Sequence, residues 1–269
     1  MPRRRSASTR KAFRIRILFV ADVFGAPGRR AVETRLPSLR EELDVDFCIV
    51  NGENAAAGRG ITAKLADKLL ASGADVVTLG NWTWGQQEIG PYLTGSDRVL
   101  RPANMSPRTP GRGLAVHGGV AVLNLLGVFA LDPFESPFLA ADRLVEEARR
   151  STAVVVVDFH AEATSEKVAF ARYLDGRVTA VLGTHTHVQT SDARVLAGGT
   201  AAITDAGMTG PHDSVIGSDE HNAIKRFVTG MPLRLEPATG DVRIEGALVE
   251  CDDAGRATSC VAVRVPVEA

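Results

Sequence analysis

The chain has 269 residues, of which 45% are hydrophobic and 23% are charged, and its formal net charge is -1. This composition is typical of a folded globular protein and argues against intrinsic disorder. No apolar run reaches the roughly 20 residues of a membrane span, and the basic start of the chain lacks the apolar segment of a secretory signal, so we expect a cytoplasmic protein without membrane contact.

The charge is distributed unevenly along the chain. Residues 1–16 carry seven Lys and Arg residues and no acidic residue, which leaves 24 basic residues against 32 acidic residues in the remainder. We predict a disordered basic leader over residues 1–14 and a single domain over residues 15–269. Outside the leader we expect no strong nucleic-acid surface. An RNA-contacting arm is the alternative role of the leader.

Short β-branched apolar runs alternate with longer amphipathic segments along most of the chain. The runs predict strands at residues 15–21, 47–50, 76–79, 120–125, 154–159, 180–183 and 201–204. The amphipathic segments predict helices at residues 28–43, 62–72, 86–93, 140–150 and 165–174. Residues 234–265 alternate like antiparallel strands, with a turn at residues 253–255. This order predicts an α/β fold with mixed sheets.

Polar side chains follow five of the predicted strands. In chain order they are Asp22, then Asn51, Glu53 and Asn54, then Asn81, then His160, and last His185 and His187. Because the carboxyl ends of parallel strands share one edge of a sheet, we expect these side chains to lie close together. Each residue alone has a structural interpretation, as a turn residue or as a hydrogen-bonded core histidine. Since three of only six histidines belong to the set, a common site is the better interpretation.

The residue types in this set predict a metal site. Imidazole nitrogens combined with carboxylate and amide oxygens suit first-row divalent transition metals better than calcium. A carboxylate such as that of Glu53 can bridge two ions, and two ions about 3.5 to 4 Å apart clamp a phosphoryl group and lower the pKa of a shared water. We therefore predict phosphate-ester hydrolysis through a hydroxide that bridges two metals.

Seven blocks of sequence carry a resemblance to a known family. They are DVFG at 22–25, VNGENAA at 50–56, VTLGN at 77–81, RPAN at 101–104, DFHAEATSEK at 158–167, GTHTHVQT at 183–190 and TDAGMTGP at 204–211. Because all seven blocks occur in the same order, the chain resembles the YmdB-like branch of the metallophosphoesterases, within the calcineurin-like phosphoesterase superfamily. The resemblance implies a four-layer α/β/β/α sandwich with two mixed central sheets. It also implies phosphodiesterase activity on small cyclic nucleotides, including 2′,3′-cyclic nucleotides.

The resemblance further implies two sets of metal ligands. Carried over position by position, one ion takes Asp22, Glu53, Asn54 and His187, and the other takes Glu53, Asn81, His160 and His185. The implied ions are iron or manganese, with zinc as the alternative. Every implied ligand position matches in this chain.

One position departs from the family pattern. After the asparagine ligand the family has a histidine that protonates the leaving oxygen, whereas this chain has Trp82, whose indole N–H is not an acid. We therefore assign no catalytic proton donor. A lost general acid costs a factor of about 10² to 10⁴. The alternative function is a weakened regulatory module that binds metal and a nucleotide, whose base would stack on Trp82.

Three other residues, His212, Glu162 and Lys167, leave alternatives open. His212 is either a replacement proton donor or a solvated loop histidine. Glu162 and Lys167 either orient metal ligands or are exposed helix charges. Cys48 lies in an apolar run, which indicates a buried and inert thiol. The sequence does not identify protein partners, and it leaves a homo-oligomer open.

Overall fold

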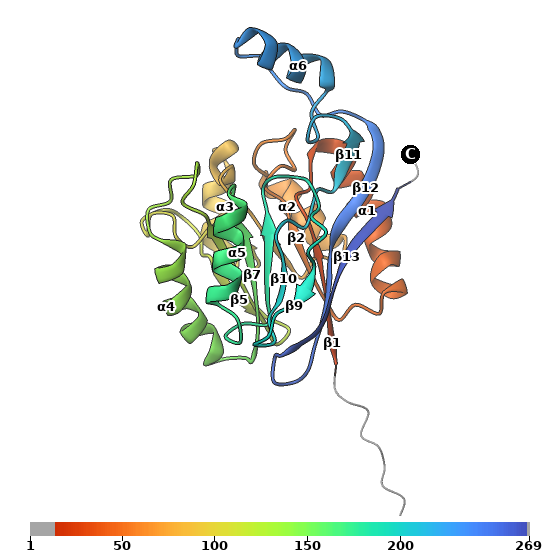
Figure 1. Cartoon of the computed structure of the whole chain (residues 1–269). Coiled ribbons are helices and arrows are strands. Elements are labelled where there is room, and N and C mark those ends of the chain that lie inside the picture. The colour runs from red at the N-terminus through yellow and green to blue at the C-terminus, as the bar shows by residue number, and fades with distance from the viewer. Residues whose placement is uncertain (1–13, 268–269) are drawn as a thin grey trace, which may run out of the picture.

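Two β-sheets stand face to face in the computed structural model, which describes residues 14–267 (Figure 1). The first sheet has the order β11-β12-β1-β2-β3-β4, and β13 pairs with β12. Its strands are β1 (Ile15–Val20), β2 (Phe47–Asn51), β3 (Val76–Thr78), β4 (Val99–Leu100), β11 (Gly210–Asp213), β12 (Gly240–Cys251) and β13 (Ala257–Pro266). Strands β1 to β4 are parallel, while β12 runs antiparallel to β1, β11 and β13. The sheet is therefore mixed, as predicted.

The second sheet is also mixed. Its order is β5-β6-β7-β8-β10-β9. Its strands are β5 (Leu114–His117), β6 (Val120–Leu126), β7 (Val154–His160), β8 (Ala180–Thr184), β9 (Arg194–Val195) and β10 (Ala201–Ile203). Strands β6, β7, β8 and β10 are parallel, and β5 and β9 are antiparallel edge strands.

Helices cover the outer face of each sheet. The first sheet is covered by α1 (Gly25–Glu42), α2 (Ala63–Ala71) and α3 (Ile89–Gly95), and the second by α4 (Pro137–Arg149) and α5 (Thr164–Tyr173). Along β1, Ile17 and Phe19 pack between the sheets, whereas Leu18 and Val20 pack under the helices. Since successive side chains of a strand point to opposite faces, such strands are apolar throughout. The predicted four-layer α/β/β/α fold is confirmed.

The structure differs from the predicted elements mainly in short segments. Helix α1 begins at Gly25 rather than at residue 28, and α3 begins at Ile89 rather than at residue 86. Residues Thr83–Gly85 form a separate 3-10 helix, η1. The prediction missed β4, β5, β9 and β11, and it missed α6 (Glu220–Thr229). These strands have two to four residues, too few to show a periodicity.

Three further predictions concern a buried cysteine, membrane-spanning helices and the basic leader. Cys48 is buried in β2, as predicted, and burial raises the pKa of its thiol to about 12. Within residues 14–267, no helix combines the length and apolarity that a bilayer crossing demands. Residues 1–13 of the predicted leader lie outside the described residues. The single domain and the disordered leader therefore stay predictions.

Candidate metal centre

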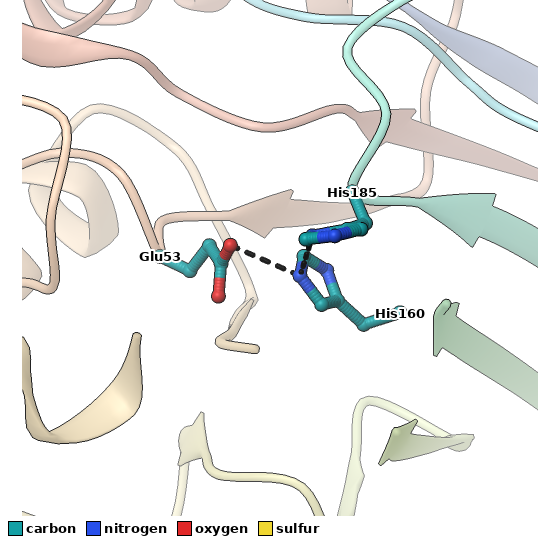
Figure 2. Close-up of side chains that lie close together, drawn as sticks. All are labelled: Glu53, His160 and His185. Carbon is teal, nitrogen blue, oxygen red and sulfur yellow. Dashed lines mark hydrogen bonds and ion pairs between the residues drawn. The ribbon is translucent and has the colours of Figure 1, made fainter. Parts of the chain in front are cut away.

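The seven predicted site residues lie together at the carboxyl ends of five strands. Asp22 follows β1, Glu53 and Asn54 follow β2, and Asn81 follows β3. From the second sheet, His160 ends β7, and His185 and His187 follow β8. The shared edge of both sheets therefore collects polar side chains from segments that are far apart in the sequence. Figure 2 shows Glu53, His160 and His185 pointing toward one another.

Four of these residues meet around one nitrogen. The Nε2 atom of His160 lies 3.0 Å from Oε1 of Glu53 and 3.0 Å from Oδ1 of Asn81. It lies 3.1 Å from Nδ1 of His185. A ring nitrogen carries at most one hydrogen and cannot satisfy three such neighbours. Single donor atoms of Glu53, His160 and His185 fall within 4.8 Å of one another, so this group is compatible with a metal ion.

A buried oxygen of the site, 3.9 Å from ring nitrogens of both His160 and His187, has no hydrogen-bond partner. Oδ1 of Asp22 is this atom. Nε2 of His187 lies 3.9 Å from it and 3.2 Å from Oδ1 of Asn54. Burial raises the pKa of Asp22 well above its usual range, and the carboxylates of Glu53 and Asp205 raise it further. Because a buried polar atom without a partner is costly, a cation beside Asp22 fits the observed arrangement.

Burial favours the neutral form of two site histidines, His160 and His185, and a neighbouring hydroxyl orients the first of them. Burial lowers the pKa of His160 to about 3 and that of His185 to about 4. The hydroxyl of Thr184 donates to Asp158, 2.7 Å away, and therefore accepts a hydrogen bond from Nδ1 of His160 at 2.9 Å. This bond leaves the lone pair of His160 on Nε2, where the other site residues converge.

The remaining two histidines are oriented in the same way. Nδ1 of His187 donates to the carbonyl of Ile216 at 2.9 Å. Nε2 of His185 lies 2.9 Å from the carboxylate of Glu162, to which it donates, so Nδ1 of His185 keeps the lone pair that faces His160. The sequence pattern did not identify Ile216 as a site residue. Its carbonyl orients His187 only because the fold brings the two loops together.

A buried ion pair fixes the loop between the two histidines of the HxH motif. Nζ of Lys167 lies 2.6 Å from Oδ2 of Asp205, and both side chains are buried. The same oxygen accepts hydrogen bonds from the backbone N–H and the hydroxyl of Thr186. The alternative of exposed charges is therefore wrong for Lys167. Glu162 is half exposed but contacts His185, so it also orients a site residue.

The backbone of the site adopts rare conformations. His185 and His187 have φ angles of 101° and 63°, and Ile216 has a φ angle of 47°. Side chains other than glycine seldom adopt positive φ, and such strain persists at functional sites where the surroundings enforce it. Gly80 is needed for space, because an added Cβ atom would overlap Glu53 and His160.

Trp82 lies beside this cluster. Its backbone N–H donates to Oε2 of Glu53 at 3.1 Å, and its indole ring is covered on one face by the guanidinium of Arg59, 3.9 Å from the ring centroid. His212 lies elsewhere in the network, with Nε2 at 3.3 Å from the buried carboxylate of Glu245. His212 lies in β11 and is only 16% exposed, so it is not a solvated loop residue, and its role as a replacement proton donor stays a prediction.

The sandwich architecture and the histidine and carboxylate cluster at its edge define a protein of the phosphoesterase class. The chain matches the model of the YmdB-like protein family over residues 18–263, and it therefore belongs to that family. It is 48% identical over 243 residues to the 2′,3′-cyclic-nucleotide 2′-phosphodiesterase of Bacillus subtilis, which covers 89% of this chain and 92% of that protein. A putative phosphatase/phosphodiesterase of Mycoplasma pneumoniae is 34% identical, with 88% of each chain covered.

Two solved structures share the whole fold. A hypothetical protein from Thermus thermophilus has a TM-score of 0.87 and 41% identity, with 94% of this chain and all of that chain covered. A novel phosphatase from Mycoplasma pneumoniae has a TM-score of 0.87 and 32% identity, with 95% and 94% covered. The predicted family is thus confirmed. The predicted class, a phosphoric ester hydrolase, is confirmed at the level of the family, since named relatives are phosphodiesterases or phosphatases.

Proposed function

We propose that this chain is a metal-dependent phosphodiesterase that hydrolyses small phosphodiesters, with 2′,3′-cyclic nucleotides as the first candidates. The Bacillus subtilis relative is named for that substrate, which supports the choice. The observation that carries the metal dependence is the buried Oδ1 atom of Asp22, which has no hydrogen-bond partner and faces His187. We place the reaction in the cytoplasm, in line with the sequence-based expectation.

We assign the seven side chains to two ion positions that share Glu53. Asp22, Asn54 and His187 complete one position, in line with the approach of Nε2 of His187 to both other side chains. Asn81, His160 and His185 complete the other position. Two divalent ions, iron or manganese with zinc as the alternative, would neutralise phosphoryl oxygens and lower the pKa of a water molecule bound between them.

The protein side chains prepare this site before a substrate arrives. Thr184, Ile216 and Glu162 each accept a hydrogen bond from the ring N–H of one histidine, so the lone pair of each ring faces the proposed ion positions. Lys167 and Asp205 hold the loop that carries His185 and His187. Ligands that are held in place need no reorganisation during the reaction, which is the main source of electrostatic catalysis.

The leaving oxygen receives no proton from residue 82. The indole N–H of Trp82 can donate a hydrogen bond but does not transfer its proton. Arg59, stacked on the same ring, contributes a positive charge beside the site. Esters with good leaving groups and strained cyclic phosphates should therefore be hydrolysed best, because they depend least on a general acid.

A second candidate function is a weakened module that binds metal and a nucleotide. The contact of Arg59 with Trp82 favours it, since an aromatic face beside a cation is a common platform for a nucleobase and its phosphate. On this reading the loaded protein would bind a cyclic nucleotide and turn it over at a negligible rate.

The test measures hydrolysis of bis(p-nitrophenyl) phosphate and of 2′,3′-cyclic AMP by manganese-loaded protein, before and after EDTA treatment. We expect EDTA to abolish activity and manganese to restore it. His185→Ala should lose about 10²-fold or more in rate and also bound metal, measured by mass spectrometry. His221→Ala is the matched control, because His221 is exposed on α6.

Three outcomes decide between the candidates. Hydrolysis that survives EDTA would refute the metal dependence. Nucleotide binding without turnover would favour the binding module. Equal and low rates for bis(p-nitrophenyl) phosphate and for an alkyl diester would contradict the proposed dependence on the leaving group.

A further inference from the structure

The side chain of Asp158 links the two sheets next to the metal centre. Asp158 lies in β7, the strand that ends at His160, and is fully buried. Its Oδ2 atom accepts hydrogen bonds from Nδ2 of Asn51 at 2.9 Å and from the hydroxyl of Thr78, which belong to β2 and β3 of the first sheet. Its Oδ1 atom accepts from the hydroxyl of Thr184, in β8 of the second sheet, at 2.7 Å. This carboxylate therefore joins strands of both sheets.

Two of these contacts continue to residues of the metal centre. Oδ1 of Asn51 accepts a hydrogen bond from the backbone N–H of Glu53 at 3.1 Å. Because this bond fixes the direction of the Asn51 amide, its NH₂ group faces Asp158. On the other side, the Thr184 hydroxyl donates to Asp158 and accepts from Nδ1 of His160 at 2.9 Å. One side chain thus holds Glu53 from the first sheet and His160 from the second.

The charge of Asp158 sets the direction of these hydrogen bonds. A carboxylate accepts hydrogen bonds and donates none, so its three neighbours all donate to it. The hydroxyl hydrogen of Thr184 therefore points at Asp158 and away from His160. The ring of His160 keeps its own hydrogen on Nδ1 and its lone pair on Nε2, the atom that lies 3.0 Å from Oε1 of Glu53. An uncharged side chain of the same shape would not impose this order.

We propose that Asp158 is a positioning residue of the metal centre, which directs the lone pair of His160 and holds the loop that carries Glu53. Asp158 acts through Thr184 and Asn51 rather than on the reacting atoms. The inference rests on the proposed function, because Glu53 and His160 are ligands in the ion positions assigned there. A group that orients metal ligands changes the metal affinity by about 10 to 100 times when it is replaced.

Asp158→Asn tests this role, because it keeps the shape of the side chain and removes the charge. An NH₂ group in place of Oδ2 would meet the NH₂ group of Asn51, so we expect it to turn to Thr184 instead. The Thr184 hydroxyl is then free to donate to Nδ1 of His160, which moves the ring hydrogen to Nε2. Nitrogen NMR of metal-free protein with labelled histidine should show this change of tautomer. Competition with a fluorescent chelator should show manganese bound about 10 to 100 times more weakly.

Thr179→Val is the matched control for the loss of buried hydrogen bonds. The buried hydroxyl of Thr179, just before β8, donates to the carbonyl of Gly255 at 2.8 Å and accepts from the N–H of Val155 at 3.0 Å. Thr179 lies at the end of the strand away from the metal centre. We expect this variant to be less stable in urea but to keep the His160 tautomer and the manganese affinity.

A second pair of variants decides the question if Asp158→Asn does not fold. Asn51→Ala and Thr78→Val each remove one hydrogen bond to Oδ2 of Asp158, but only Asn51 continues to Glu53. We expect weaker manganese binding in Asn51→Ala and an unchanged affinity in Thr78→Val. Equal affinities in the two variants would overturn the proposal.

Two further results would also overturn it. One is an unchanged His160 tautomer together with wild-type manganese affinity in Asp158→Asn. The other is an equal loss of affinity in Asp158→Asn and Thr179→Val, which would reduce the role of Asp158 to general stability. A wild-type chain that binds no manganese would instead contradict the proposed function, and the tautomer of His160 in metal-free protein would still test what Asp158 does.

Discussion

Replacing Trp82 by histidine tests the chemistry of the position that follows Asn81. The bond from residue 82 to Glu53 uses the backbone N–H and therefore survives the change of side chain. The substitution also removes the cation–π contact with Arg59, which at an exposed position is worth about 0.5 to 1 kcal/mol. The variant should accordingly fold and keep Glu53 in place.

We expect Trp82→His to hydrolyse an unstrained alkyl phosphodiester about 10² to 10⁴ times faster than the wild-type chain, because an imidazole can protonate its poor leaving oxygen. This factor corresponds to a lower activation free energy of roughly 3 to 5 kcal/mol. Bis(p-nitrophenyl) phosphate should gain much less, since nitrophenolate leaves without being protonated. The gain should therefore depend strongly on the leaving group.

The assay compares kcat for both substrates at equal metal content, measured for each variant. Trp82→Phe is the control, because it keeps an aromatic ring without adding an acid, and it should show no gain. An equal gain for both substrates, or no gain for either while two metals stay bound, would refute the assignment of residue 82 as the missing proton donor position.

Two other substitutions test the residues that support the site. Thr184→Val keeps the side-chain shape but removes the hydroxyl between Asp158 and His160, so we expect metal binding about 10 to 100 times weaker, measured by competition with a fluorescent chelator. An unchanged affinity would show that His160 needs no such partner. Lys167→Met leaves the buried Asp205 carboxylate without its cation and should lower the free energy of unfolding by about 3 to 5 kcal/mol, measured by urea denaturation. Adding Asp205→Asn should recover part of that loss, and a single variant as stable as wild type would contradict the argument.

The α/β class and its main strands could be predicted from the sequence because most of the strands are buried on both faces, whereas the four-layer arrangement was implied only by the resemblance to a known family. Val154 to Val157 in β7 alternate between the space under the helices and the space between the sheets, so the run is apolar without interruption. Each of the seven predicted strands overlaps a strand of the structure. The polar residues directly after these strands could also be placed at one edge, because a parallel arrangement brings carboxyl ends together.

Short elements could not be predicted in this way. Strand β4 has two residues, and its burial depends on pairing with β3 rather than on any local pattern. Helix α6 has a clear helical spacing of apolar residues, but it lies outside both cores and buries only Ala223. Local pattern therefore indicates which segments can form a core, and only the assembled sheets show which segments do so.

The sequence by itself determined the α/β class and the set of polar residues at the edge of the sheets. Buried strands show as local apolar runs, and the polar residues directly follow those runs in the sequence. Only the tertiary structure decided how these residues are held. The contacts of Thr184 with Asp158 and of His187 with Ile216 join segments 26 and 29 residues apart. Such hydrogen bonds depend on the distance between folded segments, and no periodicity in the chain encodes that distance. The same reason explains why the unpartnered oxygen of Asp22 became visible only in the folded chain.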